Sequence, residues 1–171
     1  MADAPPFTIR VADERDVDAL ARLRRAWLEE RSGRAGGEER LDPGFEATFA
    51  QWWRFELPRR TFWLAEVGSD RAGFTAVGSL NVVEMAHMPR PGARGGAIGH
   101  VGNAFVLASW ADRGVPRALL THAVEHARTR RYRRLVLAPT PGSTAFYRRA
   151  GFVEAGESLL VLDPVAPPPP T

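Results

Sequence analysis

The sequence predicts an α/β fold of the α+β type, in which about four helices flank a mixed, mostly antiparallel central sheet of about seven strands. Three strand-like segments follow one another between residues 62 and 107 with only turns and loops between them, which favours antiparallel pairing. The next part of the chain alternates strand, helix and strand, which favours one parallel pair. With 171 residues, 44% of them apolar, the chain is long enough for one domain with a buried core.

The first part of the chain predicts one strand and then two helices. Residues 7–11 are the strand, and Asp13 has the side chain that commonly caps the start of a helix. The second helix starts at Asp42-Pro43, because proline suits the first helical position, and it ends at Pro58. The apolar residues at helical spacing are Val17, Leu20, Ala21, Leu23, Trp27 and Leu28 in the first helix, and Phe45, Phe49, Trp52 and Trp53 in the second.

The rest of the chain predicts the remaining six strands of the sheet and the two other helices. The expected strands are 62–67, 76–85, 97–107, 134–138, 152–154 and 159–162, and the expected helices are 116–130 and 143–150. Gly151 follows the last helix at the position where glycine commonly ends one.

One domain is expected over residues 7–163, after a disordered N-terminus at 1–6 and before a proline-rich, disordered tail at 164–171. No apolar run approaches the roughly 20 residues that a membrane span needs, and the first residues lack the pattern of a signal peptide. We therefore expect a cytoplasmic protein without a membrane partner.

The composition restricts the chemistry of any active site. The chain has no cysteine, which excludes thiol nucleophiles and thiolate metal ligands. All 23 basic residues are arginine, which excludes a P-loop lysine and a lysine Schiff base. Any anion site must therefore use arginine side chains or backbone N–H groups.

A loop that opens a helix, residues 112–115, is the best candidate for such an anion site. The first N–H groups of a helix have no partner within it, and the helix dipole adds positive potential there. This arrangement commonly binds phosphate. Gly114 allows a close approach of the backbone, and Arg113 and Arg117 add positive charge on either side.

Three stretches carry a resemblance to a known family: Asn103-Ala104-Phe105-Val106-Leu107, Arg113-Gly114-Val115-Pro116-Arg117-Ala118-Leu119-Leu120 and Phe146-Tyr147-Arg148-Arg149-Ala150-Gly151-Phe152. On them the chain resembles the GNAT superfamily of N-acetyltransferases. That family has an Arg/Gln-x-x-Gly-x-Gly/Ala pattern at its third helix and a later Tyr-x-x-x-Gly-Phe ending. The order of the expected elements agrees with the family over nearly the whole chain, so 7–163 is expected to be one GNAT-like acyltransferase domain.

The resemblance implies an N-acetyltransferase that uses acetyl-CoA as acyl donor and needs no metal. The acceptor would be the amine of a small molecule or peptide, attacked directly in a ternary complex, since no cysteine can carry an acyl intermediate. Tyr147 would protonate the leaving thiolate. The implied donor-site residues are Phe105, Val106 and Leu107 along the pantetheine arm, Arg113, Gly114, Val115, Pro116 and Arg117 at the pyrophosphate, and Ser143.

Two positions depart from the family pattern. Ala111 stands where the family has arginine or glutamine, and Pro116 stands where it has a second glycine or alanine. Proline suits the first turn of a helix, but it has no N–H to donate. We therefore expect weaker binding of CoA than is usual for the fold, or a shifted position of the donor.

The base that accepts the amine proton has two candidates. His100, on the strand before the anion loop, has a side chain of the type that commonly accepts protons in enzymes and would act through a water molecule, but a half-buried strand histidine is an equal alternative. Glu84, on the preceding strand, is the second candidate, and its alternative is a solvated carboxylate. Asn103 is a candidate for positioning a water or the acceptor, and Trp27, Trp52, Trp53 and Trp63 could shape the acceptor pocket or pack in the core.

Other functions remain open from the sequence. A non-catalytic acyl-CoA-binding module of the same fold would also explain Pro116 and Ala111. The run Arg128, Arg130, Arg131, Arg133 and Arg134 leaves a basic nucleic-acid-binding domain as a minor alternative. His122 and His126 have the spacing of metal ligands but no obvious third ligand, so a surface pair is favoured. A homodimer is possible for this fold, and nothing in the last strands decides it.

Overall fold

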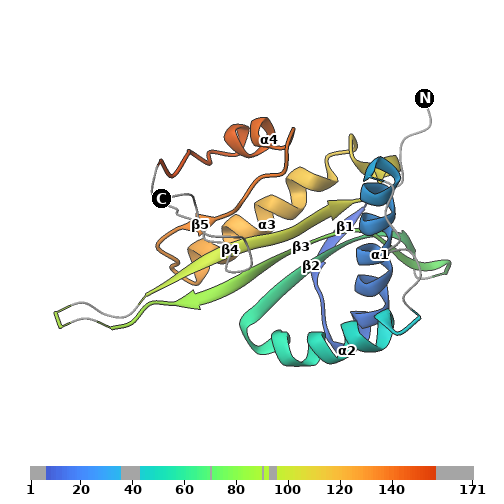
Figure 1. Ribbon diagram of the computed structural model, residues 1–171, viewed down its shortest axis with the longest axis horizontal. Helices are drawn as coiled ribbons and strands as arrows, with labels where there is room; N and C mark the ends of the chain where they lie inside the picture. The colour runs from blue at the N-terminus through green and yellow to red at the C-terminus, as the bar shows by residue number, and fades with distance from the viewer. Residues whose placement is uncertain (1–6, 36–42, 70, 90, 93–95, 157–171) are drawn as a thin grey trace, which may run out of the picture. The chain divides into compact units, whose positions relative to one another are not determined.

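The computed structural model describes residues 7–35, 43–69, 71–89, 91–92 and 96–156 (Figure 1). The chain divides into two compact units, Met1–Leu137 and Ala138–Thr171, and each is described by itself. The expected N-terminal segment 1–6 and tail 164–171 lie outside the described residues. The expected single domain over 7–163 stays a prediction.

The first unit is built on one five-stranded sheet. Its strands are β1 (Thr8–Val11), β2 (Arg60–Ser69), β3 (Gly73–Ala86), β4 (Ala97–Val106) and β5 (Leu135–Val136). They lie side by side in the order of the sequence, antiparallel from β1 to β4, and β4 pairs with β5 in parallel. The predicted mixed, mostly antiparallel sheet is confirmed.

Helices cover both faces of this sheet. α1 (Val17–Ala35), α2 (Phe45–Glu56) and α3 (Val115–Thr129) belong to the first unit, and α4 (Thr144–Arg149) to the second. The Phe62 ring contacts Trp53 of α2 at 4.9 Å, whereas the next ring, Trp63, contacts His126 of α3 at 5.2 Å. Because neighbouring side chains of a strand point to opposite faces, α2 and α3 lie on opposite sides of the sheet, as Figure 1 shows.

The predicted number of about seven strands is too high for the described residues, which hold five. Residues 152–154 do not form a strand. Instead, the backbone N–H of Phe152 donates to the carbonyl of Tyr147 at 3.1 Å and closes the end of α4. The strand expected at 159–162 lies outside the described residues, and the one expected at 134–138 is shortened to β5.

The core between α1, α2 and the sheet is apolar and partly aromatic. Its buried members include Leu20, Leu23, Trp53, Phe62 and Leu64. Burying one such side chain contributes about 1.5–3 kcal/mol to folding, so this cluster fixes α1 and α2 on their face of the sheet.

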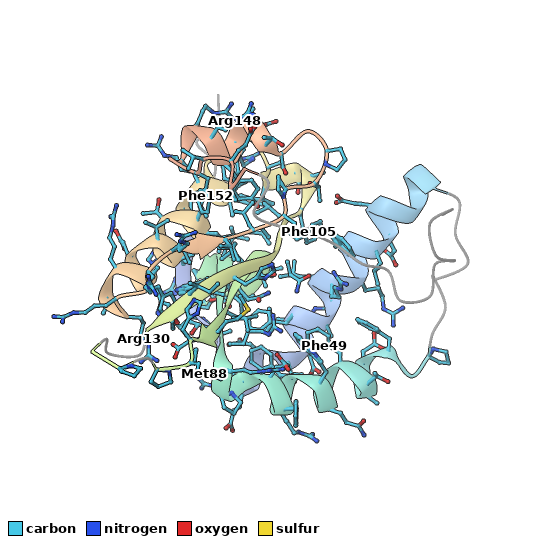
Figure 2. The ribbon with its side chains drawn as sticks, turned by 60° about the vertical axis from the view of Figure 1, so that its left-hand side comes forward. Phe49, Met88, Phe105, Arg130, Arg148 and Phe152 are labelled. Atoms are coloured by element: carbon cyan, nitrogen blue, oxygen red, sulfur yellow. The ribbon has the colours of Figure 1, made fainter. Side chains whose placement is uncertain are left out.

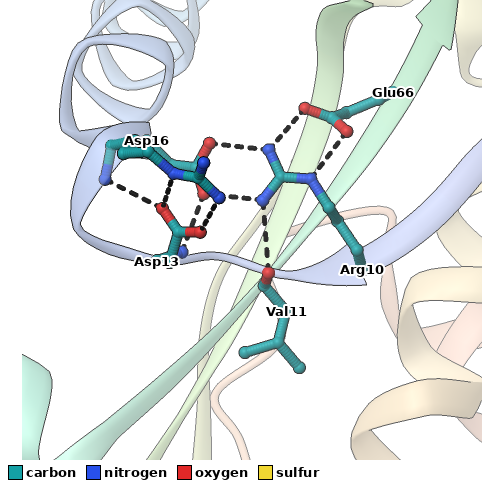
Figure 3. A network of polar contacts seen from close by, with 6 residues as sticks. Arg10, Val11, Asp13, Asp16 and Glu66 are labelled. Atoms are coloured by element: carbon teal, nitrogen blue, oxygen red, sulfur yellow. Dashed lines mark hydrogen bonds and ion pairs between the residues drawn. The ribbon is translucent and has the colours of Figure 1, made fainter.

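A buried ionic network fixes the start of α1 on the sheet (Figure 3). Arg10 of β1 donates two hydrogen bonds to Glu66 of β2, both at 2.8 Å. Its guanidinium also donates two to Asp16, both at 2.7 Å. The Asp16 carboxylate in turn accepts from the backbone N–H of Asp13, the residue that caps the 3-10 turn Glu14–Asp16 in front of α1. The predicted cap at Asp13 is thus confirmed, and it is coupled to the sheet through Arg10.

Candidate active site

An apolar pocket of about 360 Å³ lies on the face of the sheet that α1 and α2 cover. α1 contributes Leu20, Leu23, Arg24 and Trp27, α2 contributes Phe45, Thr48, Phe49 and Trp52, and the sheet contributes Phe62, Ser79, Asn103 and Phe105. Figure 2 labels Phe49 and Phe105, which line the pocket from α2 and from β4. Of the four tryptophans considered from the sequence, Trp27 and Trp52 line this pocket, and Trp53 and Trp63 are buried in the core.

A β-bulge in β4 borders the pocket. Ser79 of β3 pairs with Phe105, and Asn81 pairs with Gly102, so β4 has one residue more than β3 between these pairs. Asn103 lies in the bulge with a φ of 48°, in the left-handed region where asparagine is tolerated. Its side-chain oxygen accepts from Arg24 of α1 at 3.1 Å. The bulge therefore places Asn103 at the pocket and connects it to α1.

Beyond the bulge, β4 has one edge with no neighbouring strand among the described residues. β5 pairs with β4 only at Gly99 and His100. The backbone groups of Phe105 and Val106 on that edge are therefore available to an extended ligand, which could add to the sheet as a strand does. Leu107 donates its N–H to the Val77 carbonyl at 2.9 Å and so ends the strand on the β3 side.

The N-terminus of α3 presents backbone donors. Gly114 caps the helix with a φ of 81°, and no side chain caps this end. The first N–H bonded within the helix is that of Ala118, which donates to the Gly114 carbonyl at 3.0 Å. The N–H groups of Val115 and Arg117 are thus left for an anion, and Pro116 between them has none.

The cations of this loop differ in their surroundings. Arg113 donates through Nε to the Ser109 carbonyl at 3.0 Å and stacks on Trp110 at 5.0 Å, so it is held against the preceding turn. Arg117 is exposed, which leaves its charge available at the helix N-terminus. Ala111 donates its N–H to the Ala108 carbonyl at 3.3 Å, within that same turn.

The missing N–H at Pro116 leads to a prediction on donor affinity. Pro116→Ala restores a donor at a position that keeps its helical geometry, and a hydrogen bond to a charged acceptor is worth about 1.5–3 kcal/mol. CoA should therefore bind at least about tenfold more tightly to the variant, as measured by calorimetry. Pantetheine, which lacks the pyrophosphate, is the control and should bind both proteins equally. Unchanged CoA affinity, or an equal gain for pantetheine, would contradict the assignment of this loop.

The side chains of His100 and Asn81 lie next to Gly102, on the same face as the pocket. A Cβ on Gly102 would lie 3.6 Å from Asn81 Oδ1 and 3.9 Å from His100 Nδ1. Asn81 is fully buried, and its oxygen accepts from Arg60 at 2.8 Å, which fixes the orientation of the amide. Its Nδ2 has no hydrogen-bond partner in the described part of the chain. Because this nitrogen is itself buried, it is an unsatisfied donor within the packed sheet.

Glu84 lies on the opposite face from His100. It pairs with Gly99, while His100 pairs with Val83, and neighbouring residues of a strand point to opposite sides. Its carboxylate accepts from Arg130 at 2.8 Å and from the Tyr132 hydroxyl at 2.7 Å, and these bonds lower the pKa of Glu84. This placement favours His100 over Glu84 as the base.

Tyr147 and Ser143 belong to the second unit. The Tyr147 ring contacts Phe146 at 5.1 Å and Phe152 at 5.8 Å, and burial raises the pKa of its hydroxyl. Ser143 precedes α4, and its hydroxyl donates to the Thr140 carbonyl at 2.8 Å. Tyr147 therefore keeps its proton at neutral pH, while the Ser143 hydroxyl is used within its own turn.

The structure holds no candidate metal centre among the described residues. His126, one of the two histidines with ligand spacing, packs its ring against Trp63 and Tyr132 at 5.2 and 5.7 Å. Burial lowers the pKa of His126, which keeps the ring neutral in this aromatic contact. Within the same described ranges, none of the helices is long and apolar enough to pass through a bilayer.

Sequence reasoning missed Arg24, Ser79 and Asn81 as members of the site. Asn81 did carry a signal, because it is a polar residue within the otherwise apolar run from Leu80 to Val83. Arg24 carried none, because its contact with Asn103 joins positions 79 apart in the chain.

Comparison with known proteins gives the family. The model of the acetyltransferase (GNAT) family matches residues 20–152. A predicted acetyltransferase with acetyl-CoA from Clostridium acetobutylicum is 18% identical, with a TM-score of 0.71 over 92% of this chain and 96% of that one. Glucosamine-6-phosphate N-acetyltransferase from Arabidopsis thaliana is 13% identical, with a TM-score of 0.66 over 94% and 99%. At these identities the two structures show the fold.

A curated relative agrees over a shorter stretch. Glucosamine 6-phosphate N-acetyltransferase 1 of Oryza sativa subsp. japonica is 39% identical over 61 residues, which are 36% of this chain and 37% of that protein. The match thus spans little more than a third of the relative's length. The family model, by contrast, covers the pocket, the bulged strand and the N-terminus of α3 together, and the chain therefore belongs to the GNAT family of acetyltransferases.

Proposed function

We propose that this acetyltransferase moves an acetyl group from acetyl-CoA to the amine of an acceptor that binds in the pocket between α1, α2 and the sheet. The observation that carries the proposal is one edge of β4. There the pocket, the bulge at Asn103 and the strand-free backbone of Phe105 and Val106 occur together. An extended thioester along this edge would bring its acyl group to the mouth of the pocket.

The reaction forms a C–N bond and breaks the C–S bond of the thioester. The amine nitrogen attacks the carbonyl carbon of the thioester. The backbone N–H groups that the bulge leaves unpaired can stabilise the resulting oxyanion. The amine proton passes through water to His100. The leaving thiolate takes a proton from Tyr147. No thioester-linked acyl-enzyme forms, because the chain has no cysteine.

The donor site fits CoA with one deficit. The N–H groups of Val115 and Arg117 and the exposed Arg117 side chain suit a pyrophosphate, and Pro116 withholds one donor. That deficit supports a second candidate, an acyl-CoA-binding module of the same fold without turnover. Release of CoA thiol in the presence of a panel of amines distinguishes them, since a module would bind the donor and release none.

The first test is the melting temperature with excess acetyl-CoA. At about 100 times the Kd, binding stabilises the folded state by about 2.7 kcal/mol. For a chain of this size the melting temperature should rise on the order of 5–10 °C. Adenine alone is the control and should give no rise. The absence of a rise at millimolar acetyl-CoA would overturn the donor site.

A further inference from the structure

The charges that line the pocket restrict the acceptor. Among the residues that the structure describes, twelve line the pocket; six of these are aromatic, and none of the twelve is aspartate or glutamate. Arg24 is the one ionised side chain among them. It donates to Asn103 at 3.1 Å and stacks on the Trp27 ring at 4.1 Å. The described part of the lining thus offers a large π surface, one cation and no anion.

This lining disfavours two acceptor classes that relatives of the fold use. An amine with several positive charges needs carboxylates around it, and Arg24 would repel it. A sugar phosphate needs a cluster of cations for the phosphate and hydrogen-bond partners for each hydroxyl. Of the lining side chains in the described ranges, four are polar, namely Arg24, Thr48, Ser79 and Asn103.

The aromatic side chains form a continuous wall suited to an apolar ring. Phe49 of α2 lies 5.9 Å from Phe45 and 5.4 Å from Trp52, and Trp52 meets Phe62 edge-on at 6.1 Å. A further ring packed in these tilted geometries gains contact energy beyond area burial, and a single ammonium is attracted to the faces of such rings.

Resting on the proposed function, we infer that the acceptor is a primary amine carried on an aromatic or bulky apolar body, with no second positive charge. Two sources share this chemistry, an arylalkylamine and an aromatic amino acid. Arg24 separates them, because its guanidinium at the pocket can pair with the carboxylate of the amino acid. The experiment therefore includes both.

The test measures kcat/KM from CoA thiol release at saturating acetyl-CoA. The amines are 2-phenylethylamine, L-phenylalanine, glucosamine 6-phosphate and spermidine. One of the first two should exceed both of the others by at least about tenfold, since a buried apolar body is selected by factors of that size. If phenylalanine is preferred, Arg24→Gln should lower the ratio of kcat/KM for L-phenylalanine to that for 2-phenylethylamine by at least about tenfold. A preference for glucosamine 6-phosphate or spermidine overturns the inference.

A pair of variants on α2 ties the selectivity to the pocket. Phe49 lines it, whereas Phe55 on the same helix is 78% exposed and lies outside it. Phe49→Ala should lower kcat/KM for the preferred aromatic amine by at least about tenfold, and Phe55→Ala should leave it unchanged. Equal effects of the two variants would contradict binding of the acceptor's aromatic ring in this pocket.

A third variant tests the inference independently, so that the test does not depend on correct folding of Phe49→Ala. Thr48 is exposed at the pocket, so Thr48→Glu adds a carboxylate without disturbing the core. It should raise kcat/KM for spermidine, relative to the aromatic amine, by at least about tenfold. An unchanged ratio would contradict the electrostatic argument.

Failure of the inference can be told from failure of the proposed function. Acetyl-CoA should raise the melting temperature of every variant as it does for the parent, since the changed residues lie away from α3. A normal rise with turnover of other amines rejects the acceptor class alone. A normal rise without any turnover rejects both in favour of the binding module, and no rise rejects the donor site itself.

Discussion

Arg10→Leu should lower the free energy of unfolding by about 3 kcal/mol, which is the lower end of the cost of leaving buried charges unpaired. The Arg10 guanidinium is the shared partner of Asp16 and Glu66, whose side chains are only 9% and 11% exposed. The Arg10 side chain itself is 40% exposed, so water screens part of the interaction. Urea unfolding would measure the loss, and the melting temperature should fall by roughly 6–12 °C.

The effect of Arg10 should depend on pH in a defined direction. Hydrogen bonds from Arg10 lower the pKa of Asp16 below its ordinary 3.8. The stability that this carboxylate contributes is therefore fully present above pH 3.8 and is lost as the pH falls through the lowered value. In Arg10→Leu the unpaired carboxylates gain from protonation instead. The difference in stability between parent and variant should thus shrink as the pH falls from 7 towards 3.

Arg15→Ala is the matched control for Arg10. Arg15 pairs with Asp13 in the same turn, but the two side chains are 89% and 47% exposed. Exposed pairs of this kind contribute little to folding, so the melting temperature should not change measurably. Equal losses in the Arg10 and Arg15 variants would contradict the view that burial of Asp16 and Glu66 makes the network important.

The class of the sheet could be predicted because its signals are local. Apolar strand segments joined by turns predict antiparallel neighbours, and β2, β3 and β4 pair in that way. The prediction of a strand at 152–154 was wrong because the backbone of this segment closes the end of α4 instead. Hydrophobic periodicity does not reveal such a hydrogen bond. β5 is shorter than predicted, because it pairs with β4 at only two residues. The length of this pairing depends on the geometry of both strands.

The pocket could be predicted only in part, because its members come from distant elements. The aromatic residues of α1 and α2 were recognised as apolar helix faces, and only the structure separates Trp52, which lines the pocket, from Trp53, which is in the core. The bulge at Asn103 requires the register of β4 against β3, which a single sequence does not contain. The orientation of Asn81 depends on Arg60, which lies on the neighbouring strand.

Tyr147→Phe should lower kcat by a factor on the order of 10²–10⁴, the usual contribution of a general acid, and leave the affinity for acetyl-CoA unchanged. Burial raises the pKa of Tyr147, so the parent enzyme holds this proton across the neutral range and should show no loss of activity from its ionisation below about pH 10.

Tyr132, the other of the chain's two tyrosines, supplies the control for Tyr147. Its hydroxyl donates to Glu84 at 2.7 Å on the α3 face of the sheet, away from the pocket, so Tyr132→Phe should leave kcat unchanged. Thiol release at saturating acetyl-CoA and amine gives kcat, and calorimetry gives the donor affinity. A loss of acetyl-CoA affinity equal to the loss of activity in Tyr147→Phe would mean that this side chain binds the donor. A loss of kcat alone supports its role as the acid, because only a group needed in the transition state lowers turnover without weakening the ground-state complex.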